Sequence, residues 1–251
     1  MISRKESWFT LASGKPFYPF DPKPESVFIG NISRALSHIC RYNGHCATFY
    51  SVAQHSVICS QKVASGFELA ALLHDATEAY VGDLIRPIKV FMPDYTSMED
   101  ELYRRAIAPR FGLPTELPKE VHEVDNQVLV TEARDLLPYG ADLMKKWGIE
   151  DEPFDDVEVY NSKTPTMTPV EAEAAFLSRF YELYEGDVVP HIEDHVLTYL
   201  SSGPQSASTM SFHLSDMGVP VSGLDDIIAS LKSRGDIVVN YGSIAASRKS
   251  S

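Results

Sequence analysis

The chain of 251 residues has little cysteine and no long apolar run. Its three cysteines, Cys40, Cys46 and Cys59, are odd in number and form no C-x-x-C pair, so we expect reduced thiols that pack as small apolar groups. No apolar run reaches the roughly 18 residues that cross a membrane. The first residues, MISRKESWFT, also lack the apolar stretch of a signal peptide. Together these absences predict a soluble, cytoplasmic protein.

Basic residues are also scarce. Lys and Arg number 22 against 35 Asp and Glu, which gives a formal net charge of −13. A field of that sign repels phosphate backbones and argues against binding of polymeric nucleic acid. It does not exclude small phosphorylated substrates, because a local basic pocket or a bound cation can invert the sign. The length suggests one large domain, or one domain with a small appendage.

The pattern of apolar residues predicts a mostly α body without internal repeats. An extended arm is expected at 14–26, where four prolines occur, and an acidic surface loop at 148–166. Thr168, Pro169 and Glu171 predict the capped start of a helix. Helical spacing of apolar residues predicts helices at 31–41, 51–64, 67–80, 98–111, 118–137 and 168–184.

The chain is expected to divide into a main domain, 1–190, and a small tail, 191–251. Short helices at 195–202, 210–217 and 224–233 and a strand at 235–241 give the tail a winged-helix-like pattern. Its basic residues are balanced by acids, so a structural or protein-contact role is favoured over DNA recognition. These residues are Lys232, Arg234, Arg248 and Lys249 against Asp216, Asp225, Asp226 and Asp236.

The chemically informative segment is ALLHDATEAYVGDLIRPIK, residues 71–89. His74 and Asp75 stand together in an apolar helix, where ionisable groups are costly unless they are paired or bind a metal. Glu78 follows His74 by four residues, which predicts one shared helix face. Asp83 comes after Gly82, where this helix should end. Polar and acidic groups should therefore gather at the end of one buried helix.

Two further residues fit the same picture. His55 lies between Val52 and Val57 on a helix expected to pack inward, and Asp125 falls on the apolar stripe of its helix. An acid in that place is a pKa anomaly or a ligand. Each residue alone also has an ordinary explanation, as a satisfied core histidine or an acid that caps a turn or pairs with an arginine. Two imidazoles and two carboxylates together suit one divalent cation.

The order H…HD…D on an α-helical body resembles the HD-domain metal-dependent phosphohydrolases. The segments HDATEAYVGDLIRPIK and YSVAQHS are similar to the branch of bacterial 5′-deoxynucleotidases and related phage-encoded nucleotide phosphohydrolases, over roughly residues 8–185. The resemblance implies an HD-domain helical bundle that binds one divalent transition metal: cobalt, manganese or zinc, with magnesium as a further candidate. The implied ligands are His55, His74, Asp75 and Asp125. Glu78 is implied as catalytic, and Asp83 is implied to lie near the substrate sugar and the attacking water.

The same resemblance implies the substrate contacts. Arg41 best matches the arginine that contacts phosphate in the nucleotidases, although its distance from the first ligand differs. Arg86 and Lys89 are expected as further phosphate contacts and His45 as a substrate contact. The resemblance also implies a homo-oligomer.

The expected activity is that of a (deoxy)nucleotide phosphohydrolase, in which a metal-activated water attacks phosphorus. Two reactions remain open. One is a 5′-nucleotidase that releases orthophosphate, and the other a dNTP triphosphohydrolase that releases tripolyphosphate. A hydrolase of another phosphorylated signal, and a non-catalytic binding module, are the remaining alternatives.

Overall fold

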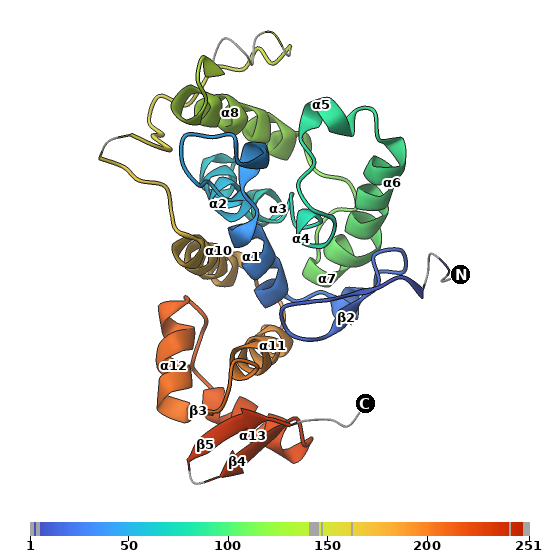
Figure 1. Ribbon diagram of the computed structural model, residues 1–251, viewed down its shortest axis with the longest axis vertical. Coiled ribbons are helices and arrows are strands. Elements are labelled where there is room, and N and C mark those ends of the chain that lie inside the picture. The colour runs from blue at the N-terminus through green and yellow to red at the C-terminus, as the bar shows by residue number, and fades with distance from the viewer. Residues whose placement is uncertain are drawn as a thin grey trace.

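The computed structural model describes residue 3 and residues 6–140, 146, 148–161, 163–240 and 242–247. The protein is mostly α-helical, as predicted (Figure 1). Within the described residues, no helix is both long and apolar enough to cross a membrane. Three tail residues of the sequence analysis, Tyr241, Arg248 and Lys249, lie outside the described residues.

Five helices pack around the segment that carries the predicted ligands: α1 (Ile29–His38), α2 (Val52–Lys62), α3 (Glu68–Leu72), α8 (Lys119–Leu136) and α10 (Pro169–Leu183). The starts of α2 and α10 follow from local capping. The Ser51 side chain accepts a hydrogen bond from the Gln54 amide at the start of α2. Thr168 and Glu171 form the predicted capping box ahead of α10. Buried apolar faces then hold α2 against α3, α8 and α10.

The helix predicted at 67–80 is wrong as one continuous element. It ends with α3, and α4 (Glu78–Val81) begins only after a non-helical turn that contains His74 and Asp75. The cause is local, because Nδ1 of His74 donates to the Ala71 carbonyl at 2.8 Å. In a continuous helix that carbonyl would accept the Asp75 amide. Glu78 and His74 therefore do not share the face of one helix.

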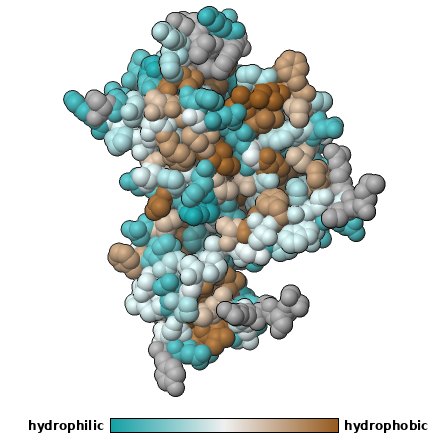
Figure 2. Space-filling view, in the orientation of Figure 1, coloured by the Kyte–Doolittle hydropathy of each residue, from teal (hydrophilic) through white to brown (hydrophobic). Residues whose placement is uncertain are grey.

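The helix predicted at 98–111 is longer and irregular. It comprises α6 (Pro93–Leu102), a π-helical turn η4 (Tyr103–Ile107) and α7 (Ala108–Phe111). Pro93 suits the first position of α6, because its missing amide would have no helical partner there. A short helix, α5 (Arg86–Lys89), precedes it and was not predicted. Figure 2 shows apolar surface around α5, where Val90 and Phe91 are exposed.

The arm near the N-terminus lies on the body. Its β1 (Phe9–Thr10) and β2 (Pro16–Phe17) pair antiparallel, a hairpin that the sequence did not predict, and η2 (Pro24–Ser26) follows. The Phe17 ring is fully buried and stacks on Tyr80 with 4.1 Å between ring centroids. This contact fixes the arm against α4 and therefore beside the site.

The tail contains α11 (Val189–Leu200), β3 (Gln205–Ser206), α12 (Ala207–Asp216), α13 (Leu224–Ser233), β4 (Ile237–Asn240) and β5 (Ser243–Ala246). Its strands form an antiparallel sheet in the order β3-β5-β4. The predicted strand corresponds to β4. The two-residue β3 and the weakly patterned β5 (SIAA) were missed, and α11 begins six residues before the expected 195.

The tail docks on α1 through polar and apolar contacts. The buried Asp194 carboxylate accepts from Lys15 Nζ at 2.7 Å and from Asn31 Nδ2 at 2.9 Å. Gly30 allows close approach, since a Cβ at this position would lie 2.6 Å from Nδ1 of His195. One apolar core runs from the body into the tail. The division at 190/191 stays a prediction, and it falls where the two parts share this core.

Candidate metal centre

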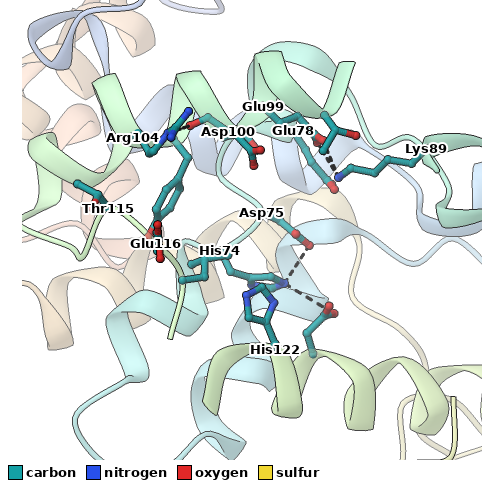
Figure 3. Close-up of a pocket in the computed structure, with 15 residues that line it drawn as sticks. His74, Asp75, Glu78, Lys89, Glu99, Asp100, Arg104, Thr115, Glu116 and His122 are labelled. Carbon is teal, nitrogen blue, oxygen red and sulfur yellow. Dashed lines mark hydrogen bonds and ion pairs between the residues drawn. The ribbon is translucent and has the colours of Figure 1, made fainter. Parts of the chain in front are cut away.

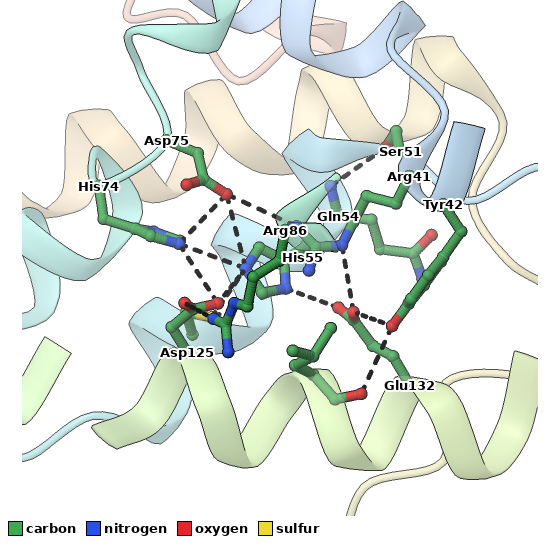
Figure 4. Close-up of polar contacts among 12 residues, drawn as sticks. Arg41, Tyr42, Ser51, Gln54, His55, His74, Asp75, Arg86, Asp125 and Glu132 are labelled. Carbon is green, nitrogen blue, oxygen red and sulfur yellow. Dashed lines mark hydrogen bonds and ion pairs between the residues drawn. The ribbon is translucent and has the colours of Figure 1, made fainter. Parts of the chain in front are cut away.

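Four predicted ligands converge although they come from three separate segments. His55 lies on α2, His74 and Asp75 lie in the turn after α3, and Asp125 lies on α8 (Figure 4). The two Nε2 atoms of the histidines are 3.3 Å apart. Asp125 Oδ1 is 3.2 Å from Nε2 of His55, and Asp75 Oδ2 is 3.2 Å from Nε2 of His74.

These separations match those of ligands around one ion. Two nitrogens held about 2.05 Å from a zinc-like ion at the tetrahedral angle lie about 3.3 Å apart. Donor atoms of His55, Cys59, His74 and Asp125 all lie within 4.8 Å of one another, so this group could hold a metal ion. Asp75 Oδ2 is also 3.6 Å from Nε2 of His55 and adds a further oxygen at the same place. The donors present therefore fit a divalent cation.

The centre is electrostatically suited to positive charge. Burial would lower the pKa values of His55 and His74, but the charges of Cys59 and Glu132 raise the pKa of His55, and the charge of Asp75 raises that of His74, well above the usual range. Burial would likewise raise the pKa of Asp75, yet the adjacent His74 and His55 bring it to about 2. The pKa of Asp125 is held well below its usual range in the same way. A bound cation would replace the imidazole protons.

Both imidazoles are oriented by hydrogen bonds from their second nitrogen. Nδ1 of His55 lies 2.6 Å from Glu132 Oε1, and Nδ1 of His74 lies 2.8 Å from the Ala71 carbonyl. An acceptor at Nδ1 places the proton there and leaves the Nε2 lone pair for an ion. Glu132 was not predicted from the sequence. The spacing in the sequence could have indicated it, because Glu132 follows Asp125 by seven residues and so lies two turns along the same side of α8.

Glu132 is the centre of a buried hydrogen-bond network. Its carboxylate also accepts from Tyr50 Oη at 2.8 Å, Tyr42 Oη at 3.0 Å and Arg41 Nε at 3.1 Å. Tyr42 and Asn43 both have positive φ, 57° and 51°, in the turn that carries these groups. Such a backbone persists only where its surroundings hold it, and the Tyr42–Glu132 bond is one such contact.

Arg41 lies inside this network. It is 9% exposed, and its Nη1 is 3.6 Å from Asp75 Oδ2. The guanidinium therefore lies between the Glu132 and Asp75 carboxylates. Through Arg41, the glutamate that orients His55 is connected to Asp75. Arg41 is not among the residues that line the adjacent cavity, and its predicted phosphate contact stays a prediction.

A cavity of about 510 Å³ lies beside the centre (Figure 3). Glu78 lines it, is 7% exposed, and has an oxygen, Oε2, with no hydrogen-bond partner among the described residues. Burial, followed by the charges of Asp75 and Asp83, raises the pKa of Glu78 well above its usual range. A carboxyl group that keeps its proton beside a cavity suits proton transfer.

The other predicted residues lie around the centre in different ways. Asp83 is half-buried and does not line the cavity; burial raises its pKa, which Arg41 partly offsets. Lys89 lines the cavity, but its Nζ is 2.9 Å from Glu99 Oε1. Arg86 is half-exposed, and its Nη2 is 3.7 Å from Asp125 Oδ2. His45 is exposed and does not line the cavity. The predicted substrate contacts remain predictions.

The far wall of the cavity was not predicted. It comes from α6, η4 and the segment before α8, and it includes Asp100, Arg104 and Glu116. His122 is exposed and also lines the cavity. Nothing in the sequence marks these side chains, because they are ordinary exposed polar residues on helices and loops.

Comparison with known proteins identifies relatives. No family model matches the chain. It is 39% identical over 179 residues to the uncharacterized protein YfdR of Escherichia coli (strain K12), an alignment that covers 71% of this chain and 97% of the relative. It is 35% identical over 127 residues to an uncharacterized protein of Rhodobacter capsulatus, covering 47% of this chain and 64% of that protein. The chain therefore belongs to the family of Escherichia coli YfdR.

Proposed function

We propose that this protein is an HD-type metal-dependent phosphohydrolase that acts on (deoxy)nucleotides. The observation that carries the proposal is the convergence of His55, His74, Asp75 and Asp125 beside a cavity. These residues occur in the H…HD…D order of the phosphohydrolases that the chain resembles. The proposed fold is an HD-domain helical bundle with a winged-helix-like tail, supported by the order helix, strand, two helices and two strands from α11 to β5.

The chain's own residues have distinct roles in this proposal. A bound divalent cation supplies Lewis acidity to a phosphoryl oxygen and to a water molecule. Glu132 and the Ala71 carbonyl orient the two imidazoles, and Arg41 holds the Asp75 carboxylate in place. Glu78 holds a proton beside the cavity and transfers it to the leaving oxygen.

The charge of the cavity favours a monophosphate over a triphosphate. Beyond the candidate ligands and the protonated Glu78, its wall carries the acids Glu99, Asp100 and Glu116 against the cations Lys89 and Arg104, and Lys89 is already paired with Glu99. A triphosphate would place several negative charges against this wall. A nucleoside monophosphate puts its charge at the cation and its neutral sugar and base toward the acids. The cavity volume of about 510 Å³ lies within the range of about 300–1,000 Å³ that is typical of small-molecule sites.

A phosphate-release screen tests the proposal. Purified protein is incubated with deoxynucleoside mono- and triphosphates and with cobalt, manganese, zinc or magnesium. We expect orthophosphate from monophosphates, with kcat/KM at least about tenfold above that for triphosphates, a difference of about 1.4 kcal/mol. Tripolyphosphate as the main product would reassign the protein as a triphosphohydrolase. If the protein binds no metal and releases no phosphate, the binding-module alternative is favoured.

The role of Glu78 gives a separate prediction. Glu78→Gln keeps the side-chain shape but removes the transferable proton, so kcat should fall by about 10²–10⁴ while metal content stays unchanged. The matched control is Glu123→Gln on the exposed side of α8, where the carboxylate pairs only with Lys119 among the ion pairs of the described residues. Steady-state kinetics and metal analysis of both variants make the comparison. Wild-type turnover in Glu78→Gln would remove this residue from the mechanism.

A further inference from the structure

The thiol of Cys59 lies against the candidate ligands, where the sequence predicts only apolar packing. Its Sγ is 3.5 Å from Nε2 of His55, the nitrogen that faces the other donors. The thiol is fully buried. We propose that Cys59 is an additional ligand of the metal centre, and that this soft donor makes the centre prefer zinc, cobalt or cadmium over magnesium. The inference rests on the proposed metal centre and deepens it.

The distances have the values that shared coordination requires. A thiolate about 2.3 Å and an imidazole nitrogen about 2.05 Å from one ion lie about 3.5 Å apart at the tetrahedral angle. The separation of Cys59 Sγ from His55 Nε2 is 3.5 Å. Sγ also lies within 4.8 Å of the donor atoms of His74 and Asp125. The thiol therefore lies at a coordination distance from His55 and close to the other donors of the group.

The backbone explains why the thiol lies there. Cys59 follows His55 by four residues on α2, which places both side chains on one helix face about a turn apart. Cys59 also belongs to a buried apolar cluster that includes Val121, Val124 and Val128 of α8. These contacts leave Sγ directed at His55. The other two thiols differ, since Cys40 and Cys46 lie 3.8 Å from each other and outside the group of donors.

Ligation by Cys59 would change the protonation of the thiol and the metal preference of the centre. The Cys59 thiol gives up its proton to the solvent as the sulfur–metal bond forms, so that one proton is released for each ion bound through sulfur. Thiolate is a soft ligand that suits zinc, cobalt and cadmium, whereas magnesium favours oxygen ligands. With Asp75 included, the chain offers five donors, of which Cys59 alone is soft.

Cobalt binding provides the test. Metal-free protein is loaded with Co²⁺, and its near-ultraviolet spectrum is recorded together with the bound cobalt per chain. The wild type should show a thiolate-to-cobalt charge-transfer band. Cys59→Ser should bind cobalt without this band, and its preference for Cd²⁺ over Mg²⁺ should fall at least about tenfold. The matched controls, Cys40→Ser and Cys46→Ser, should keep both.

The outcomes separate this inference from the proposed function. Wild-type protein that binds cobalt without the band would overturn the role of Cys59 and leave the metal centre standing. Wild-type protein that binds no cobalt would contradict the metal centre itself. If Cys59→Ser does not fold, X-ray absorption of the unmodified cobalt protein decides: a sulfur neighbour at about 2.3 Å supports the inference. A shell of only nitrogen and oxygen refutes it.

Discussion

Asp75→Ala should abolish both metal binding and phosphate release. Asp75 Oδ2 lies 3.2 Å from Nε2 of His74 and 3.6 Å from Nε2 of His55, so its loss removes a charged oxygen from the centre. Loss of an outer hydrogen-bond partner of a ligand already costs about 10–100-fold in metal affinity, and we expect a larger loss here. Metal analysis by mass spectrometry after dialysis, together with a phosphate assay, measures both effects.

The control for this variant is Asp100→Ala, which removes an exposed carboxylate from the same cavity but not from the centre. It should keep one metal ion per chain. The proposed role of Asp75 would be refuted if Asp75→Ala retained metal and turnover, or if both variants lost metal equally.

Glu132→Ala should be the most destabilising single change at the site. The substitution removes the nearer of the two carboxylates beside the buried Arg41 guanidinium and the carboxylate acceptor of the Tyr42 and Tyr50 hydroxyls. Breaking a buried ion pair by removing one partner costs about 3–5 kcal/mol. The imidazole of His55 also loses its orienting acceptor, so metal affinity should fall by about 10–100-fold. Urea unfolding and metal titration measure the two effects.

Glu173→Ala is the matched control, because Glu173 is another buried glutamate, on α10, whose carboxylate lies 3.3 Å from Arg34 Nη1. It should lose some stability without a change in metal affinity. A Glu132→Ala protein as stable as the wild type would contradict the network, and unchanged metal affinity would contradict its role in orienting His55.

The same network predicts how stability depends on pH. Burial would raise the pKa of Glu132, but the charges of Arg41 and His55 lower it below its usual value. The contribution of Glu132 to stability is therefore fully present above the usual carboxyl range. It is lost as the pH falls through the lowered pKa. Metal-free wild type should lose more stability on acidification than metal-free Glu132→Gln, which lacks this titration.

The candidate ligands could be predicted from the sequence because each breaks a simple local pattern. His55 and Asp125 are polar residues on apolar helix faces, and His74–Asp75 interrupts an apolar run. The helices α2, α8 and α10 followed from apolar periodicity, and Thr168 marked the start of α10 through its capping box.

What could not be predicted depends on which partner each side chain takes in the folded chain. The break after α3 arises because one His74 ring nitrogen takes a backbone acceptor, which no spacing rule reveals. The burial of Arg41 between Glu132 and Asp75 requires the packing of α8 against the turn that carries Arg41. Cys59 resembled any small apolar residue of α2 until the positions of its neighbours were known.

Anomalous X-ray diffraction from crystals of the cobalt-loaded protein tests the central claim most directly. The account predicts one strong peak at about 2.0–2.3 Å from Nε2 of both His55 and His74 and from an Asp125 oxygen. A peak bound elsewhere on the chain, or imidazoles of His55 and His74 that contact no common ion in a fully loaded crystal, would contradict it.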